Sequence, residues 1–331
     1  MRIQWKYSRD IVLVILLSIM LIPLVNAEDH SHHLRLEGKF KQDGQDVAWT
    51  QKEFHNKPEN FQFAIVSDRT SGYRPGVFES AVKKINLLQP EFVMSVGDFI
   101  EGYTHDVDVL EHDWDEFERI VDALEMPFFY VPGNHDYCGI DAMKQQWQKR
   151  FGPSYYHFVY GDVLFLCLNT EDPPVICAHP DNCFSDEQMA YFQAAIKANK
   201  EVRWTIIFMH NPVGWVDDLD HWKELEAMLG DMPYTVFSGH VHSYKKTIRN
   251  GRNYYTLSVT GGQGHGPAEV DRDPPYPHGN GKTRSMVREK GNYDHIVWVT
   301  MTGNGPVVAN LLLEGILDDK AIPTTVPVVY E

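Results

Sequence analysis

The chain is poor in cysteine, in basic residues and in long apolar runs, and each shortage excludes a class of protein. Its 331 residues include four cysteines. None of them forms a Cys-x-x-Cys pair, so a cysteine-ligated zinc site is poorly supported. Lysine and arginine number 30 against 46 aspartate and glutamate residues, which gives a net charge of −16. A chain this acidic repels nucleic acid and anionic membranes, so we expect it to bind neither.

The N-terminal segment differs from the rest of the chain. Residues 1–10 carry three basic side chains, residues 11–25 are almost wholly apolar, and small or apolar residues lead up to Ala27. This pattern predicts a secretory signal peptide over residues 1–27 and therefore a secreted or periplasmic protein. The apolar run is about 15 residues, short of the roughly 20 that span a bilayer. An uncleaved membrane anchor is the alternative, and we expect no membrane span in the mature chain.

Cleavage after Ala27 would remove three basic residues and one acidic residue, leaving 27 basic against 45 acidic residues. Cysteines of an exported protein can pair. Cys177 and Cys183 flank a turn-rich stretch, and we predict a disulfide between them. Cys167 lies in an apolar run, so we predict that it is a small buried core residue.

Apolar runs alternate with helical patterns from residue 61 onward, which predicts an α/β fold with helices covering β-sheets. The predicted domains are a signal peptide (1–27), a polar N-terminal extension (28–60), one large domain (61–313) and a C-terminal tail (314–331). Residues 261–292 are rich in glycine, proline and charge, and are predicted to form a long functional or disordered loop. Helices are predicted over 75–88, 109–124, 142–151, 185–200 and 221–229, and strands over 61–67, 91–96, 127–131, 155–160, 162–169, 204–209, 234–238, 254–259, 294–301 and 306–313.

Polar residues with oxygen or imidazole ligands follow several of the predicted strands. Strand ends in such a sheet meet at one edge, so these side chains are expected to lie close together. Carboxylates supply charge to a divalent ion, while imidazoles and amides set its geometry, as hydrolysis at a metal requires. The candidate ligands are Asp68, Asp98, Asn134, His210, His240 and His242.

The order and spacing of these residues resemble the calcineurin-like metallophosphoesterase superfamily over about residues 61–260. The motifs are Asp68-Arg69-Thr70, Gly97-Asp98, Gly133-Asn134-His135-Asp136, His210 and Gly239-His240-Val241-His242. The resemblance implies two packed mixed β-sheets flanked by helices, with two metal ions at the strand ends. It also implies a hydrolase acting on phosphoric ester bonds.

The resemblance assigns roles to the motif residues. Asp98 would bridge two ions, with Asn134, His210 and His240 completing one site and Asp68 and His242 holding the other. A hydroxide bridging the ions would attack phosphorus in line, and His135 would stabilise the transition state or protonate the leaving oxygen. Beyond the resemblance, the position of Asp136 suggests that it orients His135 or caps its loop. Arg69, next to Asp68, is expected to bind the substrate phosphate, or else to be a surface residue or form a structural ion pair.

One residue departs from the family pattern. Where the family has the histidine of Asp-x-His, this chain has Thr70, so one ion loses an imidazole. Purple acid phosphatases also lack that histidine and supply a tyrosine three residues after the bridging aspartate. Glu101 stands there instead, with Tyr103 two residues further on. We hypothesise that Glu101 or Thr70 supplies an oxygen ligand to this ion, or that the ion binds weakly.

The resulting prediction is an exported metallophosphoesterase that acts on a small phosphorylated substrate, a phosphomonoester or a phosphodiester. Its cofactors would be two divalent or trivalent ions, chosen from Mn, Fe, Zn and Mg. The alternative, motivated by Thr70, is a non-catalytic or single-metal descendant that binds phosphate or a partner. Sequence patterns leave the substrate and the oligomeric state open.

Overall fold

The computed structural model describes residues 57, 59–172, 184–212, 220–263 and 291–316, and the backbone at 276–277 and 283–284. All of them belong to one compact unit within residues 57–331. The predicted signal peptide, the Cys177–Cys183 pair and most of the C-terminal tail lie outside the described residues. Among the described helices, none has the length and apolar character needed to cross a membrane.

The first sheet has five strands in the order β13-β12-β1-β2-β3, and its strands run both parallel and antiparallel. β1 pairs in parallel with β2 and antiparallel with β12, so the N-terminal strand lies beside one from the end of the domain. The strands are β1 (Phe61–Val66), β2 (Val93–Ser95), β3 (Phe128–Phe129), β12 (His295–Thr302) and β13 (Gly305–Leu312).

The second sheet has six strands in the order β4-β5-β6-β7-β9-β8 and is also mixed. Its centre, from β5 to β9, is parallel, and an antiparallel strand closes each edge. The strands are β4 (Tyr156–Tyr160), β5 (Val163–Cys167), β6 (Trp204–Phe208), β7 (Tyr234–Ser238), β8 (Lys245–Arg249) and β9 (Arg252–Thr256). A separate pair joins β10 (Tyr276–Pro277) to β11 (Thr283–Arg284).

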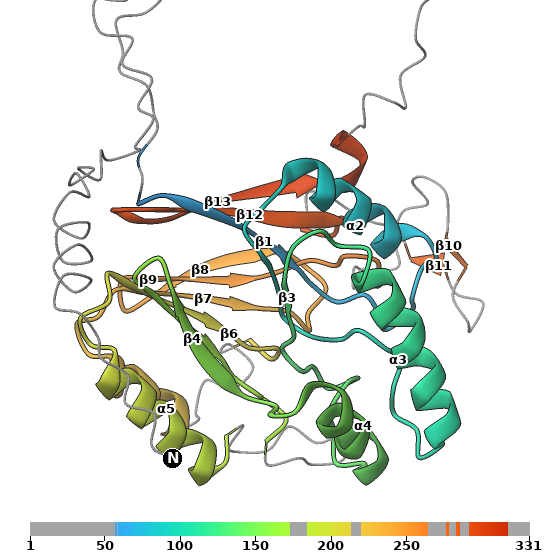
Figure 1. The fold of residues 1–331 in the computed structure, drawn as a ribbon, viewed down its shortest axis with the longest axis horizontal. Coiled ribbons are helices and arrows are strands. Elements are labelled where there is room, and N and C mark those ends of the chain that lie inside the picture. Colours follow the sequence, from blue (N-terminus) through green and yellow to red (C-terminus); the bar gives the residue numbers. More distant parts are fainter. Residues whose placement is uncertain are drawn as a thin grey trace, which may run out of the picture. The chain divides into compact units, whose positions relative to one another are not determined.

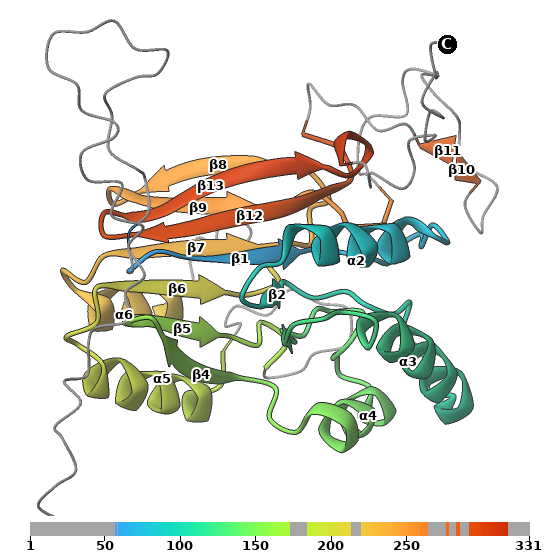
Figure 2. The same cartoon turned by 45° about the horizontal axis from the view of Figure 1, so that its top comes forward.

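Helices cover the outer face of each sheet (Figures 1 and 2). Buried side chains of α2 (Val77–Leu88), α3 (Val107–Val121) and α4 (Asp141–Phe151) pack with those of the first sheet. Those of α5 (Asp186–Ala198) and α6 (Asp220–Leu229) pack with the second sheet. The short 3₁₀ helix η3 (Leu313–Gly315) follows β13.

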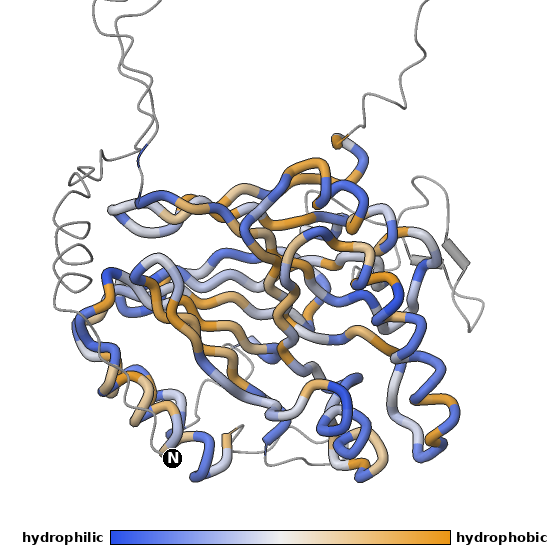
Figure 3. The backbone as a smooth tube through the Cα atoms, viewed as in Figure 1, coloured by the Kyte–Doolittle hydropathy of each residue, from blue (hydrophilic) through white to orange (hydrophobic). Residues whose placement is uncertain are grey.

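The two sheets pack against each other through a third apolar cluster. This cluster consists of inward-facing residues of both sheets, such as Phe63 of β1, Phe165 and Cys167 of β5, and Phe208 of β6. Figure 3 shows the apolar colouring concentrated along these central strands. Cys167 is fully buried and unpaired, which confirms its predicted place in the core. The two mixed, packed sheets flanked by helices therefore match the predicted fold class.

The predicted elements mostly coincide with the observed ones, with two informative differences. The strand β8 was not predicted, because Lys245-Lys246-Thr247 has no apolar alternation and the strand is largely exposed. The strand β3 has only two residues, although the apolar run that contains it is longer. In both places backbone pairing with a neighbouring strand, rather than side-chain pattern, decides the length of the strand.

Candidate metal centre

The loop after β2 brings two motif residues into an unusual backbone conformation. Gly97 has φ +97° and Asp98 has φ +63°. Positive φ is strained for an aspartate, and such strain concentrates at functional sites. A Cβ atom on Gly97 would stand 2.6 Å from the backbone nitrogen of Gly133 and 2.9 Å from His210 Nδ1. The glycine is therefore required where the Asp98 loop, the Asn134 loop and His210 meet.

Asp136 joins the Asp98 loop to the Asn134 loop. Its buried carboxylate accepts hydrogen bonds from the backbone N–H groups of Asp98 (2.6 Å), Phe99 (2.7 Å), Ile100 (3.3 Å) and Gly133 (2.9 Å). Burial and the Asp98 carboxylate raise the pKa of Asp136 to about 8, and the N–H donors act in the opposite direction. Of its two predicted roles, these contacts match the capping of the loop.

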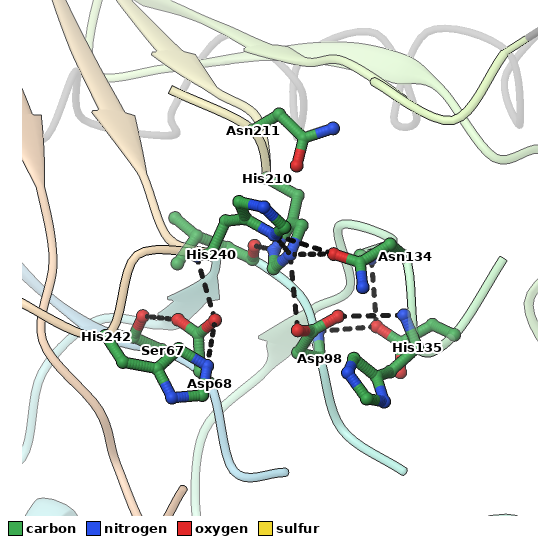
Figure 4. Close-up of polar contacts among 12 residues, drawn as sticks. Ser67, Asp68, Asp98, Asn134, His135, His210, Asn211, His240 and His242 are labelled. Atoms are coloured by element: carbon green, nitrogen blue, oxygen red, sulfur yellow. Dashed lines mark hydrogen bonds and ion pairs between the residues drawn. The ribbon is translucent and has the colours of Figure 1, made fainter. Parts of the chain in front are cut away.

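Four ligand atoms converge at one side of Asp98 (Figure 4). Asn134 Oδ1 lies 2.8 Å from both His210 Nε2 and His240 Nδ1. The two imidazole nitrogens are 3.3 Å apart, and His210 Nε2 is 3.3 Å from Asp98 Oδ2. Two imidazole nitrogens, an amide oxygen and a carboxylate oxygen so close together are a set of atoms that a divalent cation can bind once the ring nitrogens facing it are unprotonated.

A second group lies at the other side of Asp98. His242 Nε2 is 3.1 Å from Asp68 Oδ1, and both side chains are buried. Within each group, Asp98-His210-His240 and Asp68-Asp98-His242, the potential ligand atoms all lie within 4.8 Å of one another. Asp98 belongs to both groups, as a bridging ligand must. The donor set of carboxylates, imidazoles and one amide therefore fits two metal ions.

The imidazoles are held by backbone carbonyls, which fixes which nitrogen faces the centre. His210 Nδ1 is 2.7 Å from the carbonyl oxygen of Val96, and His242 Nδ1 contacts that of Gln263. A carbonyl oxygen only accepts, so each Nδ1 carries a proton and each Nε2 is the nitrogen that faces the carboxylates of the centre. A carbonyl partner of this kind is typical of metal-binding histidines.

Asp68 is fixed from three directions. Its carboxylate accepts from the Ser67 hydroxyl and from the backbone N–H of His240, the latter at 2.8 Å. Its carbonyl oxygen accepts from the N–H groups of Thr260 and Gly262. His240 and His242 both have positive φ, at +70° and +55°. The loops after β1, β7 and β9 are thus bonded to one another at the ligands.

Strong electrostatic interactions link the buried ligands. Burial disfavours the charged form of His210, yet the Asp98 carboxylate raises its pKa to about 10. Burial and the neighbouring His210 lower the pKa of His240 to about 3. Burial also opposes ionisation of Asp68, but the adjacent His242 lowers its pKa below the usual value. These carboxylates need a positive partner, and a divalent ion supplies one.

His135 lies beside the ligands without belonging to either group. Its Nδ1 donates to the carbonyl oxygen of Glu101 at 2.7 Å, so Nε2 is the ring nitrogen left for other partners. Its backbone N–H donates to Asp98 Oδ1 at 3.0 Å. A Cβ on Gly102 would stand 1.8 Å from the His135 carbonyl oxygen, so the two loops touch directly. The structure therefore brings His135 to the edge of the centre.

The two candidates for the missing ligand have different surroundings. The Glu101 carboxylate accepts from the backbone N–H groups of Gly72 (3.2 Å) and Tyr73 (2.9 Å) and belongs to neither ligand group. Thr70 is fully buried, and its Oγ1 has no hydrogen-bond partner among the described residues. The structure therefore brings Glu101 into neither ligand group, and two backbone amides hold one of its carboxylate oxygens, Oε1, at residues 72 and 73.

Arg69 is also placed away from the ligands. Its guanidinium donates to the carbonyl oxygen of Phe99 at 2.8 Å, lies 3.1 Å from Glu116 and stacks over Tyr73 at 3.9 Å. The side chain is 3% exposed. Of the roles considered for Arg69, these contacts match the structural ion pair, because the nearby α3 supplies its countercharge.

Tyr103 is a site residue whose role the sequence did not reveal. The Asn134 amide nitrogen donates to its phenol oxygen at 2.6 Å, and its ring meets the edge of the His135 imidazole, with centroids 4.7 Å apart. The bond fixes the Asn134 amide with its oxygen toward His210 and His240. A tyrosine shortly after the Gly-Asp motif was the available clue, although its spacing differs from that of purple acid phosphatases.

Comparison with known proteins identifies the family. A family model described as calcineurin-like phosphoesterase matches residues 61–244, more than half of the chain. The chain belongs to the calcineurin-like phosphoesterase family. The family is described as one of phosphoesterases, and the two ligand groups of this chain fit two metal ions.

The curated relatives share only about a quarter of their aligned residues with this chain. The serine/threonine-protein phosphatase CPPED1 of Homo sapiens is 27% identical over 219 residues, covering 59% of this chain and 66% of that protein. The match to the Bos taurus protein of the same name covers 58% of its length. Purple acid phosphatase 18 of Arabidopsis thaliana is 25% identical over 50% of this chain and 44% of its own. The chain thus spans about two thirds or less of these relatives.

Solved structures share the phosphoesterase fold. A dimetal phosphatase from Danio rerio has 14% identity and a TM-score of 0.52, covering 76% of this chain and 99% of its own. A purple acid phosphatase from yellow lupin has 13% identity and a TM-score of 0.54, covering 78% of this chain and 52% of its own. At such identities the likeness shows the fold alone, namely two mixed sheets flanked by helices.

Proposed function

We propose that this protein is an exported phosphoesterase that hydrolyses a phosphomonoester or a phosphodiester with two metal ions. The observation that carries the proposal is the sharing of Asp98 between two ligand groups at one edge of the sheets. Asn134, His210 and His240 would hold one ion with Asp98, while Asp68 and His242 would hold the other. Ions bound there would neutralise phosphoryl oxygens and activate a water molecule.

The protein residues around the ligands would orient the substrate and move protons. His135 is suited to donate a proton to the leaving oxygen, because the Glu101 carbonyl fixes its Nδ1 and leaves Nε2 for the substrate side. Asp136 would keep the Asp98 and Asn134 loops at a fixed separation through its four backbone bonds. Arg69, paired with Glu116 of α3, would support these loops rather than contact phosphate.

Thr70 is the favoured oxygen ligand to the ion at Asp68 and His242. Its buried hydroxyl has no hydrogen-bond partner among the residues described, whereas two amides engage the Glu101 carboxylate. Titration of Mn²⁺ into the Thr70→Val and Glu101→Gln proteins distinguishes the two candidate ligands. We expect the valine variant to lose affinity at one of two sites and the glutamine variant to keep both. Loss of a site in the glutamine variant alone would restore Glu101 as the ligand.

Turnover of model esters would test the substrate class. p-Nitrophenyl phosphate reports monoesterase activity, and bis-p-nitrophenyl phosphate reports diesterase activity. Curated relatives include proteins named as serine/threonine-protein phosphatase and purple acid phosphatase, names that favour a monoester. We therefore expect faster hydrolysis of the monoester, inhibited by a chelator and recovered with added metal.

A non-catalytic or single-metal binding protein is the second candidate, and Thr70 is the observation that favours it. The loss of an imidazole next to Asp68 weakens one site and leaves His210, His240 and Asn134 to hold a single ion. Phosphate binding without turnover in the fully metallated protein would support this reading. Turnover that depends on His135 would refute it, because a binding module has no need of a proton donor.

Export is proposed from the N-terminal pattern of basic, apolar and small residues in residues 1–27. N-terminal sequencing of protein recovered from the periplasm or culture medium tests it. A mature chain that begins at Glu28 is the expected result. An uncleaved chain in the membrane fraction would support an anchored form instead.

A further inference from the structure

A second polar cluster adjoins the metal centre, beyond the ends of two neighbouring parallel strands. Glu171 follows β5, and Asn211 follows β6 directly after the ligand His210. The Asn211 amide nitrogen donates to Glu171 Oε1 at 2.8 Å, and its backbone N–H donates to the Thr170 hydroxyl at 3.2 Å. The pair therefore links the loop after β5 to the ligand loop after β6.

The loop that carries Glu171 is held firmly from α5. Gln188 is fully buried, and its amide accepts from the backbone N–H of Asn169 at 2.9 Å and donates to the carbonyl oxygen of Asn169 at 3.0 Å. The Asn169 side chain in turn accepts from the Glu171 N–H at 2.8 Å. A loop fixed by these bonds presents its side chains in one arrangement, as a binding site requires.

Two buried polar atoms of this cluster have no hydrogen-bond partner among the described residues. They are the amide oxygen of Asn211, which is 5% exposed, and the amide nitrogen of fully buried Asn169. The orientation of the Asn211 amide is fixed, because its nitrogen must face the Glu171 carboxylate. Buried polar atoms of folded proteins are paired with protein, water or ligand in the great majority of cases. The amide oxygen of Asn211 is thus a buried hydrogen-bond acceptor that could accept from a bound ligand.

The cluster is close enough to the metal centre to contact the same substrate. His210 and Asp98 both interact electrostatically with the Glu171 carboxyl group. Figure 4 shows Asn211 above His210, with its amide oxygen directed toward the ligand side. Burial of the Glu171 carboxyl group raises its pKa to about 7.

We propose that Glu171 and Asn211 form a subsite that recognises a hydrogen-bond donor, a hydroxyl or ammonium group, on the alcohol esterified to the phosphate. The inference rests on the proposed phosphoesterase function and narrows its substrate class. The pair presents the free Asn211 oxygen and the Glu171 carboxyl, both of which accept hydrogen bonds. An alkyl group of the same size would give the buried Asn211 oxygen no hydrogen-bond donor, which costs binding free energy.

Three phosphate monoesters of nearly equal size test the subsite: 2-hydroxyethyl, 2-aminoethyl and n-propyl phosphate. The measured quantity is kcat/KM for each ester with the metallated wild-type protein. We expect at least one of the two donor-bearing esters to exceed the propyl ester by about 10- to 100-fold, the effect of one or two buried hydrogen bonds.

Single substitutions then test whether Asn211 and Glu171 cause the preference for the donor-bearing esters. Asn211→Leu keeps the size of the side chain and removes its amide, so the preference over propyl phosphate should fall toward unity. Glu171→Gln, a second variant of the same pair, should lower the ratio of the aminoethyl ester to the hydroxyethyl ester. Asn199→Leu is the control, because among the described residues the Asn199 amide donates to one partner, the carbonyl of Ala195 near the end of α5. It should keep the wild-type preference.

The possible outcomes distinguish failure of the proposed subsite from failure of the proposed phosphoesterase function. Failure of wild-type protein to hydrolyse any ester, including p-nitrophenyl phosphate, would overturn the proposed function. Hydrolysis of all three alkyl esters at equal kcat/KM would leave the function standing and overturn the subsite. A wild-type preference that survives in folded Asn211→Leu protein would likewise overturn it. A preference lost in that variant and retained in Asn199→Leu is the supporting result.

Discussion

Replacing Gly97 by alanine should weaken metal binding as well as destabilise the fold. A Cβ atom there would lie 2.6 Å from the nitrogen and 2.8 Å from the Cα of Gly133, both backbone atoms. Ordinary contact begins at about 3.4 Å, so the two loops must separate by about 0.8 Å. Metal–ligand distances tolerate about 0.2 Å. The Asp98 carboxylate and the Asn134 amide can therefore no longer reach one ion together.

Gly97→Ala should lower the free energy of unfolding for two reasons. Alanine at φ +97° costs roughly 1–2 kcal/mol, and overpacking against backbone costs about 1–3 kcal/mol more. Gly76→Ala is the matched control, because Gly76 has φ +84° and open space around the added Cβ. It should show the first cost alone and bind metal like the wild type.

For both variants, isothermal titration with Mn²⁺ measures the metal affinity and urea denaturation measures the free energy of unfolding. We expect at least a 10-fold loss of metal affinity in Gly97→Ala and none in Gly76→Ala. Wild-type metal affinity in folded Gly97→Ala protein would refute the packing argument. An equal loss in both variants would show that backbone strain alone, rather than loop separation, controls the centre.

Three further perturbations test other contacts. Tyr103→Phe removes the phenol oxygen that orients Asn134, so metal affinity by titration should fall about 10-fold, and an unchanged affinity would exclude that role. His135→Ala should lower kcat by roughly 10²- to 10⁴-fold with metal content by mass spectrometry unchanged; full activity would exclude it as the proton donor. Although burial opposes ionisation of Glu226, its bonds to Arg249 lower its pKa. Its stabilisation is therefore present above the unfolded pKa near 4.3 and lost as pH falls through the lower folded value. Glu226→Gln should cost about 1–3 kcal/mol in urea denaturation at pH 7 and less near pH 3, and an equal cost at both pH values would contradict the ion pair.

The fold was predictable where side-chain pattern decides structure. Apolar runs gave the inner strands of both sheets, because their side chains fill the core between the sheets. β8 was missed because an edge strand with Lys245 and Lys246 needs only its backbone bonds to β9. The pairing of β1 with β12 joins distant parts of the chain, and no local pattern specifies it.

The site was predictable where a motif fixes both residue type and position. Asp68, Asp98 and the three strand-end histidines meet as the motifs imply, because parallel strands end at one edge. The placement of Arg69 and Glu101 depends on partners that the sequence does not reveal. Glu116 on α3 takes the guanidinium, and the amides of residues 72 and 73 take the carboxylate.

Tyr103, Glu171 and Asn211 were not predicted as site residues for a related reason. Their side chains bond to neighbours from other loops, and such bonds have no sequence pattern. Thr70 is the reverse case: its buried hydroxyl has no hydrogen-bond partner among the described residues. Its position was noted from the motif, while its surroundings became visible only in the fold.

Metal content measured together with ester hydrolysis tests the central claim most directly. The protein, loaded with Mn, Fe or Zn and freed of excess ion, would be analysed by mass spectrometry beside turnover of p-nitrophenyl phosphate with and without chelator. The shared Asp98 predicts about two ions per chain, chelator-sensitive turnover, and loss of both in Asp98→Asn protein. One ion or none, with no turnover under any metal, would contradict a dinuclear phosphoesterase.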